Sequence, residues 1–209
     1  SFKHSVPELP KNWEPFKLVV EREDEVNKTK WTQLHQVISD CGDNLDLFDF
    51  IEPCKLKKWL QYQEPKTGMT PVFLAVSKER LDILKRIFPK DPEFKLIEAI
   101  KSPNFQSRSA LHEACMLGNI DIVAFLCEAG WEPKDVDDNH CNAAFYAATY
   151  GHLKVLEYLL SLCPDNESRK KLLYERHKDD YTILHGAVNY KRPADSGHED
   201  EKGAELDTI

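Results

Sequence analysis

The sequence is poor in the features that mark membrane proteins, disulfide-rich proteins and many enzymes. No apolar run approaches the roughly 18–20 residues that span a bilayer, and the first 15 residues lack the apolar core of a signal peptide. No CxxC pair occurs among the six cysteines, so a disulfide framework or zinc ribbon is disfavoured. Reduced thiols in a reducing compartment fit this pattern, which predicts a cytoplasmic location, with the nucleus as an alternative.

The chain also lacks a basic excess. It carries 28 Lys and Arg against 36 Asp and Glu, a net charge of −8, which disfavours nucleic acid as the main partner. Hydrophobic residues make up 41% and charged residues 31% of the 209 positions, as in globular proteins. We therefore expect one large domain or two small ones, with no segment inserted into a membrane.

What the sequence does contain is an internal repeat. Residues 109–126 and 142–159 align at an offset of 33 residues. Each has a helix-capping residue, a short stretch rich in small residues, a glycine, and then an apolar stretch of helical period. Similar segments open at Thr70 and Thr182, and a divergent one opens at Thr32.

The physical features of a helix pair recur in these segments. Their first residues all belong to the set that caps helix N-termini: Thr32, Thr70, Ser109, Asn142 and Thr182. Gly118 and Gly151 predict the left-handed turn that ends the first helix. An alanine recurs at one slot, where a small side chain lets neighbouring helices approach closely: Ala75, Ala114, Ala147 and Ala187. One such pair cannot bury its apolar face alone, so stability must come from stacking.

Residues such as Thr70-Pro71, Leu111-His112-Glu113-Ala114 and Gly118-Asn119-Ile120 resemble the ankyrin repeat. Its signature is T-P-L-H-x-A-A followed by G-x-x-x-V-V-x-x-L-L. The resemblance covers roughly residues 29–190, and it implies an all-α solenoid of five stacked helix pairs with finger loops between them.

The spacings between segments exceed the family period in three of four cases, being 38, 39, 33 and 40 residues. Each long gap holds a proline and a short amphipathic stretch, at residues 53–62, 92–100 and 164–174, which predicts extra one- to two-turn helices. Residues 1–28 are interpreted as a partly extended lead-in that caps the first repeat.

The C-terminal residues depart from the repeat. Residues 191–202 are polar and charged where an outer helix is expected, and Gly203 to Ile209 looks like the displaced start of that helix. We interpret 191–209 as an acidic insertion within a repeat of a longer protein, with a disordered tail as the alternative.

Histidines invite a metal or catalytic interpretation, but three of the eight occupy one repeat slot. His35, His112 and His185 are equivalent to Phe73 and Phe145, so the slot does not require a ligand. A buried imidazole bonded to loop backbone is the expected role. No second ligand pair complements His112 and Cys115, and no catalytic string is present. We therefore expect no metal, no cofactor and no enzyme activity.

The resemblance places partner contacts on the finger tips and on the exposed side of the inner helices. Carried over by position, the candidate partner-binding residues are Phe105, Arg108, Met116, Leu117, Asp138, Tyr150, Tyr181 and Tyr190. Aromatic residues, Met and Arg are enriched at the centres of interfaces. Acidic residues around them, such as Asp137 and Asp179, could steer a basic partner.

Two functions fit this sequence. The first is a non-catalytic module that binds a peptide or protein within a scaffold or adaptor. The second is a cytoplasmic regulatory domain of a larger channel or enzyme, in which the repeats contact their own chain.

Overall fold

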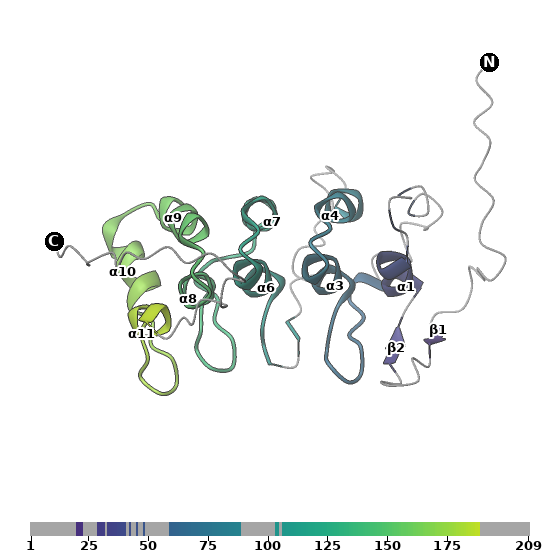
Figure 1. Ribbon diagram of the computed structural model, residues 1–209, viewed down its shortest axis with the longest axis horizontal. Coiled ribbons are helices and arrows are strands. Elements are labelled where there is room, and N and C mark those ends of the chain that lie inside the picture. The colour runs from purple at the N-terminus through teal and green to yellow at the C-terminus, as the bar shows by residue number, and fades with distance from the viewer. Residues whose placement is uncertain are drawn as a thin grey trace, which may run out of the picture.

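The computed structural model describes residues 20–22, 29–31, 33–40, 42, 45, 48, 59–88, 103–104 and 106–188. Its helices form two rows above a row of finger loops (Figure 1). The inner row is α1 (Gln33–Asp40), α3 (Pro71–Ser77), α6 (Ala110–Leu117), α8 (Ala143–Thr149) and α11 (Ile183–Val188). The outer row is α4 (Leu81–Ile87), α7 (Ile120–Glu128) and α9 (Leu153–Ser161). The predicted all-α stack of helix pairs is confirmed.

The inner helices begin at the capping residues that the sequence predicts. The side chains of Thr70, Ser109 and Asn142 each accept a hydrogen bond from the backbone N–H three residues later. These bonds satisfy donors that have no partner inside the helix. The caps therefore place the start of α3, α6 and α8 at equivalent points of successive repeats.

A left-handed glycine ends α6 and redirects the chain into α7. Gly118 has a φ of 75°, and Gly151 at the corresponding turn after α8 has a φ of 74°. The imidazole of His152 lies over Gly118, with its Nε2 within 2.9 Å of the Met116 carbonyl oxygen. The His152 side chain thus connects the turn after α6 to the start of α9, the outer helix of the next repeat.

Stacked inner helices form one continuous core. The repeated alanine slot is fully buried at Ala75, Ala114 and Ala147. Larger apolar side chains from the outer helices, such as Ile122 and Leu159, fill the space behind the inner row. The small residues allow α3, α6, α8 and α11 to pack side by side, as the repeat pattern predicts.

The third predicted extra helix is present as α10 (Asn166–Tyr174) between α9 and α11. Asp165 caps it, Leu172 is buried, and the Asn142 side chain donates a hydrogen bond of 2.8 Å to the Leu172 carbonyl. Of the other two predicted helices, only residues 59–62 of the first are described, and 92–100 lie outside the described residues.

The two ends of the stack differ from the middle. Near the N-terminus, β1 (Val20–Arg22) pairs antiparallel with β2 (Thr29–Trp31). At the other end, Leu184 and Val188 on α11 are 72% and 84% exposed, whereas their equivalents in α3, α6 and α8 are buried. The expected insertion at 191–209 lies outside the described residues.

Within the described ranges, every helix is too short or too polar to cross a bilayer.

Candidate protein-binding surface

Backbone hydrogen bonds join consecutive finger loops along the base of the stack. The Asp138 N–H donates to the Gln106 carbonyl at 3.2 Å, and the Lys178 N–H donates to the Asn139 carbonyl at 3.0 Å. The tips of the fingers at 106–108, 131–142 and 175–181 therefore lie next to one another. Residues at corresponding positions of these fingers can contact a single ligand together.

Asp137 organises the middle finger. Its buried carboxylate accepts the N–H groups of Asn139 and Cys141 through Oδ1, at 2.8 and 2.9 Å. Its Oδ2 accepts the hydroxyl of Tyr146 on α8 at 2.6 Å. Burial and the neighbouring Asp137 raise the pKa of Tyr146, so this phenol stays a donor. The finger is thereby fixed to the inner helix with Asp138 exposed at its tip.

Two histidines of the repeated slot have the structural role that the sequence predicts. Buried His112 accepts the Ser109 N–H at Nδ1, and its Nε2 lies 2.9 Å from the Asp135 carbonyl of the next finger. His35 likewise lies 3.1 Å from the Met69 carbonyl. The prediction of a buried imidazole is wrong for His185, which is exposed, because no described finger follows it.

Arg108 lies at the centre of a cluster on the inner-helix surface. Its guanidinium lies 3.5 Å from the Glu113 carboxylate, donates to the Met116 sulfur at 3.4 Å, and sits 5.9 Å from the Phe73 ring centroid. Its Nε is buried and has no hydrogen-bond partner among the described residues. Burial raises the pKa of Glu113, and the charge of Arg108 partly opposes this shift. The cluster joins two predicted contact residues, Arg108 and Met116.

The other described candidates are exposed as the sequence predicts. Leu117 and Tyr150 end α6 and α8 at equivalent positions and are 36% and 40% exposed, while Tyr181 on the last finger is 44% exposed. Phe105 and Tyr190 lie outside the described residues. We refer to Arg108, Met116, Leu117, Asp138, Tyr150 and Tyr181 as the concave strip.

A row of aromatic rings crosses the bases of the last fingers. Phe145 stacks on His177 with centroids 5.9 Å apart, and His177 meets the edge of Tyr181 at 6.0 Å. Tyr181 in turn meets the ring of His185 at 5.6 Å. These contacts hold the Tyr181 ring in place while leaving part of it exposed to solvent.

Sequence reasoning missed Glu113 and Tyr146 as members of this surface. Both occupy the slot that Leu74 fills in the repeat that opens at Thr70. Across the five repeats this slot holds Gln36, Leu74, Glu113, Tyr146 and Gly186, so the repeat pattern gave no signal that could have identified them. Their partners, Arg108 and Asp137, come from finger loops and become neighbours only through the fold.

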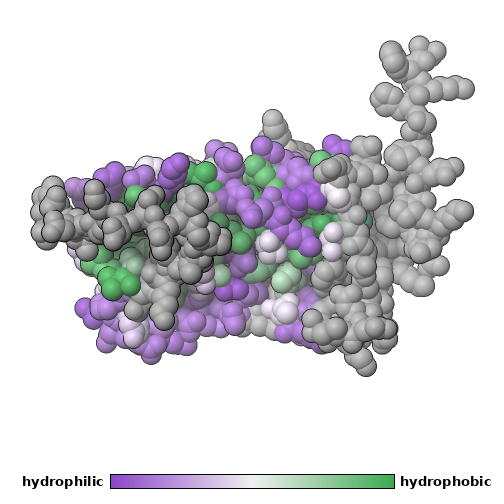
Figure 2. Space-filling view, viewed as in Figure 1, coloured by the Kyte–Doolittle hydropathy of each residue, from purple (hydrophilic) through white to green (hydrophobic). Residues whose placement is uncertain are grey.

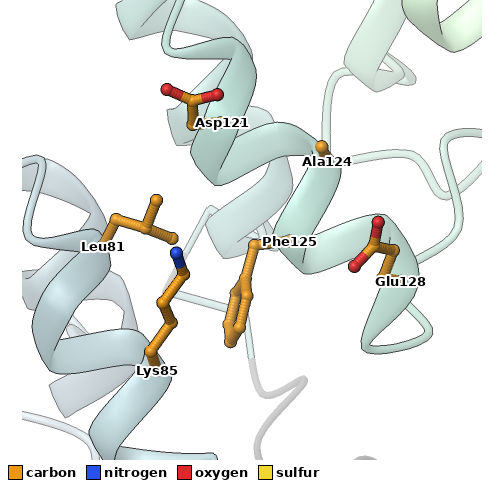
Figure 3. Close-up of a pocket in the computed structure, with 6 residues that line it drawn as sticks. All are labelled: Leu81, Lys85, Asp121, Ala124, Phe125 and Glu128. Atoms are coloured by element: carbon orange, nitrogen blue, oxygen red, sulfur yellow. The ribbon is translucent and has the colours of Figure 1, made fainter.

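A groove of about 380 Å³ lies on the opposite side of the stack, between outer helices α4 and α7. Leu81 and Lys85 face Phe125 across it, and Asp121 and Glu128 lie along its α7 side (Figure 3). The Phe125 ring is already packed against Phe88, with centroids 5.7 Å apart. Its mixed charges favour no single class of ligand.

In the described part of the chain, no group of three His, Cys, Asp or Glu side chains could hold a metal ion. Burial raises the pKa of the Cys127 thiol to about 11, and that of Cys115 is raised as well. These thiols stay protonated and are poor nucleophiles at neutral pH.

Hydropathy divides the molecule into bands. In Figure 2, hydrophobic side chains gather across the middle, between hydrophilic finger loops and hydrophilic outer helices. The finger segments 131–142 and 175–181 together carry seven carboxylates and three basic side chains. These two finger segments, which contribute Asp138 and Tyr181 to the concave strip, are therefore acidic overall.

Comparison with known proteins agrees with this architecture. The family described as ankyrin repeats (3 copies) matches residues 34–134 and 94–171, together more than half of the chain. Transient receptor potential cation channel subfamily A member 1 of Drosophila melanogaster is 30% identical over 93 residues. That alignment covers 44% of this chain and 8% of the channel protein, so the chain spans only a small part of that relative.

Proposed function

The chain belongs to the ankyrin-repeat family, and from this premise we propose that it is a non-catalytic module that binds a protein or peptide across the concave strip. Ankyrin repeats generally mediate protein–protein interaction. The observation that carries the proposal is the partial exposure of Leu117, Tyr150 and Tyr181 on consecutive repeats. Monomeric proteins that expose several large apolar side chains in one patch commonly use them to bind a partner.

The strip has the composition of an interface. Tyr, Met and Arg are enriched at interface centres, and Tyr150, Tyr181, Met116 and Arg108 supply them here. Arg108 and Tyr181 are held by contacts within the chain, so little side-chain freedom is lost when a partner binds. These features support a pre-formed surface.

The experiment is capture of the natural partner by wild-type protein and by Tyr150→Ala and Leu117→Ala variants. Truncation of an interface hot spot typically costs about 2 kcal/mol, roughly thirtyfold in affinity. We expect weaker capture by both variants with a nearly unchanged melting temperature, because both side chains point away from the buried core. Leu153→Ala is the matched control, since Leu153 is 64% exposed on outer helix α9.

The proposal fails if Tyr150→Ala and Leu117→Ala bind the partner as tightly as Leu153→Ala does. It also fails if Tyr150→Ala unfolds the domain while the folded fraction still binds. The first result would move the partner to the outer helices or the inserted segments. The second would make Tyr150 a packing residue.

The similarity to a cation channel favours a second candidate, a cytoplasmic regulatory region of a larger channel that contacts its own chain. Such a role uses the same strip, with a segment of the parent protein as the ligand. Cross-linking from position 150 within the parent protein separates the two, since an intrachain product supports the regulatory role and an interchain product supports the adaptor role.

A further inference from the structure

We propose that the concave strip binds an extended, basic peptide segment, with Lys or Arg side chains of the partner placed over Tyr150 and Tyr181. This rests on the proposed function and adds the chemical class of the partner. The observations that carry it are the exposed tyrosines, the exposed finger carboxylates that have no Lys or Arg partner among the described residues, and the contacts that already occupy Arg108, the one basic side chain within the strip.

The spacing of the strip suits an extended chain. Neighbouring packed helices lie about 8–10 Å apart, and an extended peptide advances about 3.3 Å per residue. Side chains three residues apart in the partner therefore reach successive repeats. Leu117 and Tyr150 occupy equivalent C-terminal ends of α6 and α8 and provide this repeat-to-repeat spacing, whereas Tyr181 precedes α11 at the position that Arg108 has before α6.

Carboxylates outnumber basic groups along the edge of the strip. Two of the three basic side chains in finger segments 131–142 and 175–181 are paired: Lys134 with Glu132 at 2.6 Å, and Arg176 with Asp180 at 3.3 Å. Lys178 is the third. Four exposed carboxylates in these segments have no ion pair with a Lys or Arg of the described residues: Asp135, Asp138, Glu175 and Asp179. The net field at this edge favours a cation.

The strip is poorly suited to an anionic partner. Arg108 already faces Glu113 at 3.5 Å and donates to the Met116 sulfur, and its Nε is buried. A phosphate or carboxylate would have to displace these contacts and approach the acidic fingers. A partner cation meets no such obstacle, since Tyr150 and Tyr181 present partly exposed rings that attract ammonium and guanidinium groups.

The test uses the full chain, labelled with ¹⁵N, and three synthetic peptides of the form (Xaa-Ala-Ser)₄ in which Xaa is Lys, Gln or Glu. Chemical shifts report where each peptide binds, and titrations at low and high salt report affinity. We expect the Lys peptide to bind at least tenfold more tightly than the Gln peptide. Its shifts should centre on fingers 131–142 and 175–181 and on the end of α8.

Two matched pairs of variants separate a specific site from general attraction. Asp138→Asn with Asp179→Asn should weaken Lys-peptide binding and its salt dependence, whereas Glu128→Gln with Glu157→Gln on the outer helices makes the same charge change away from the strip. Tyr150→Ala and Tyr181→Ala should each weaken binding about two- to fivefold. Tyr174→Ala is the aromatic control, because Tyr174 is 68% exposed on α10.

The inference is overturned if the Glu peptide binds as well as the Lys peptide, or if shifts appear on the outer helices instead of the strip. Equal losses from the two carboxylate pairs would also overturn it, because they would indicate non-specific attraction to an acidic protein. If natural-partner capture depends on Tyr150 and Leu117 but the Lys peptide does not bind, the proposed function stands and only this inference fails.

Discussion

At the scale of single residues, two glycines show how differently the same residue type can be constrained. Gly118 and Gly42 both have positive φ, at 75° and 51°. A Cβ at Gly118 would overlap the imidazole of His152, whereas a Cβ at Gly42 would meet open space. Gly118 is therefore required for both its backbone conformation and its close contact, and Gly42 for its conformation alone.

We expect Gly118→Ala to lower the free energy of unfolding by more than Gly42→Ala does. A left-handed alanine costs about 1–2 kcal/mol, and at position 118 the displacement of His152 from the Met116 carbonyl adds to this cost. Urea denaturation of both variants measures the difference. Equal losses would show that the turn moves away from His152 without penalty.

Two tyrosines of α8 and its C-terminal cap differ in the same way, since one is bound within the protein and the other is exposed. Tyr146 and Tyr150 lie four residues apart on the sequence, yet the hydroxyl of Tyr146 is bound by Asp137 while Tyr150 is 40% exposed. Tyr146 therefore positions the finger, and Tyr150 is available to a partner.

At the scale of elements, the finger loops share a conformation that their sequences do not share. The residue two positions before each inner-helix cap has a positive φ, and it is glycine in one finger only: Gly68, Ser107, His140 and Asp180. Positive φ strains residues that have a Cβ. The stack thus holds three consecutive fingers in a conformation that favours glycine.

We expect His140→Gly to raise the free energy of unfolding by about 0.5 kcal/mol. Relief of left-handed strain outweighs the added entropy of the unfolded chain at this position. Asn139→Gly is the control, because Asn139 has no positive φ and should only lose stability. Chemical denaturation compares the two, and a destabilised His140→Gly variant would show that the imidazole makes a contact that outweighs its strain.

At the scale of the whole molecule, buried histidines make the free energy of unfolding depend on pH. Burial lowers the pKa of His35 to about 4, and it lowers the pKa of His112 as well. The unfolded chain titrates near 6.5, so it takes up protons that the folded chain excludes. Their contribution to stability is complete above about pH 6.5 and is lost as the pH falls towards 4.

We expect the free energy of unfolding to fall by up to about 3 kcal/mol through His35 alone across this range. The raised pKa of Glu113 partly opposes this loss. His35→Phe, which introduces the residue found at the equivalent Phe73, should flatten the profile. Urea denaturation between about pH 7 and pH 4.5 measures both proteins. A wild-type profile that stays flat in this window would contradict a buried, neutral His35.

The sequence by itself determined the local features of the repeat. The caps at Thr70, Ser109 and Asn142 and the turns at Gly118 and Gly151 depend on a few adjacent residues, so their chemistry could be recognised directly. Exposure of Leu117 and Tyr150 could likewise be predicted from the repeat slot.

Only the tertiary structure decided which polar groups meet. Arg108 reaches Glu113 and Met116, and Asp137 reaches Tyr146, because each finger folds back against an inner helix. The tertiary structure also decides that His185 is exposed. Burial of a histidine in this slot requires the finger of a following repeat, and the described residues contain no such finger. Capping and turn signals act over three or four residues, whereas burial and pairing depend on how whole repeats stack against one another.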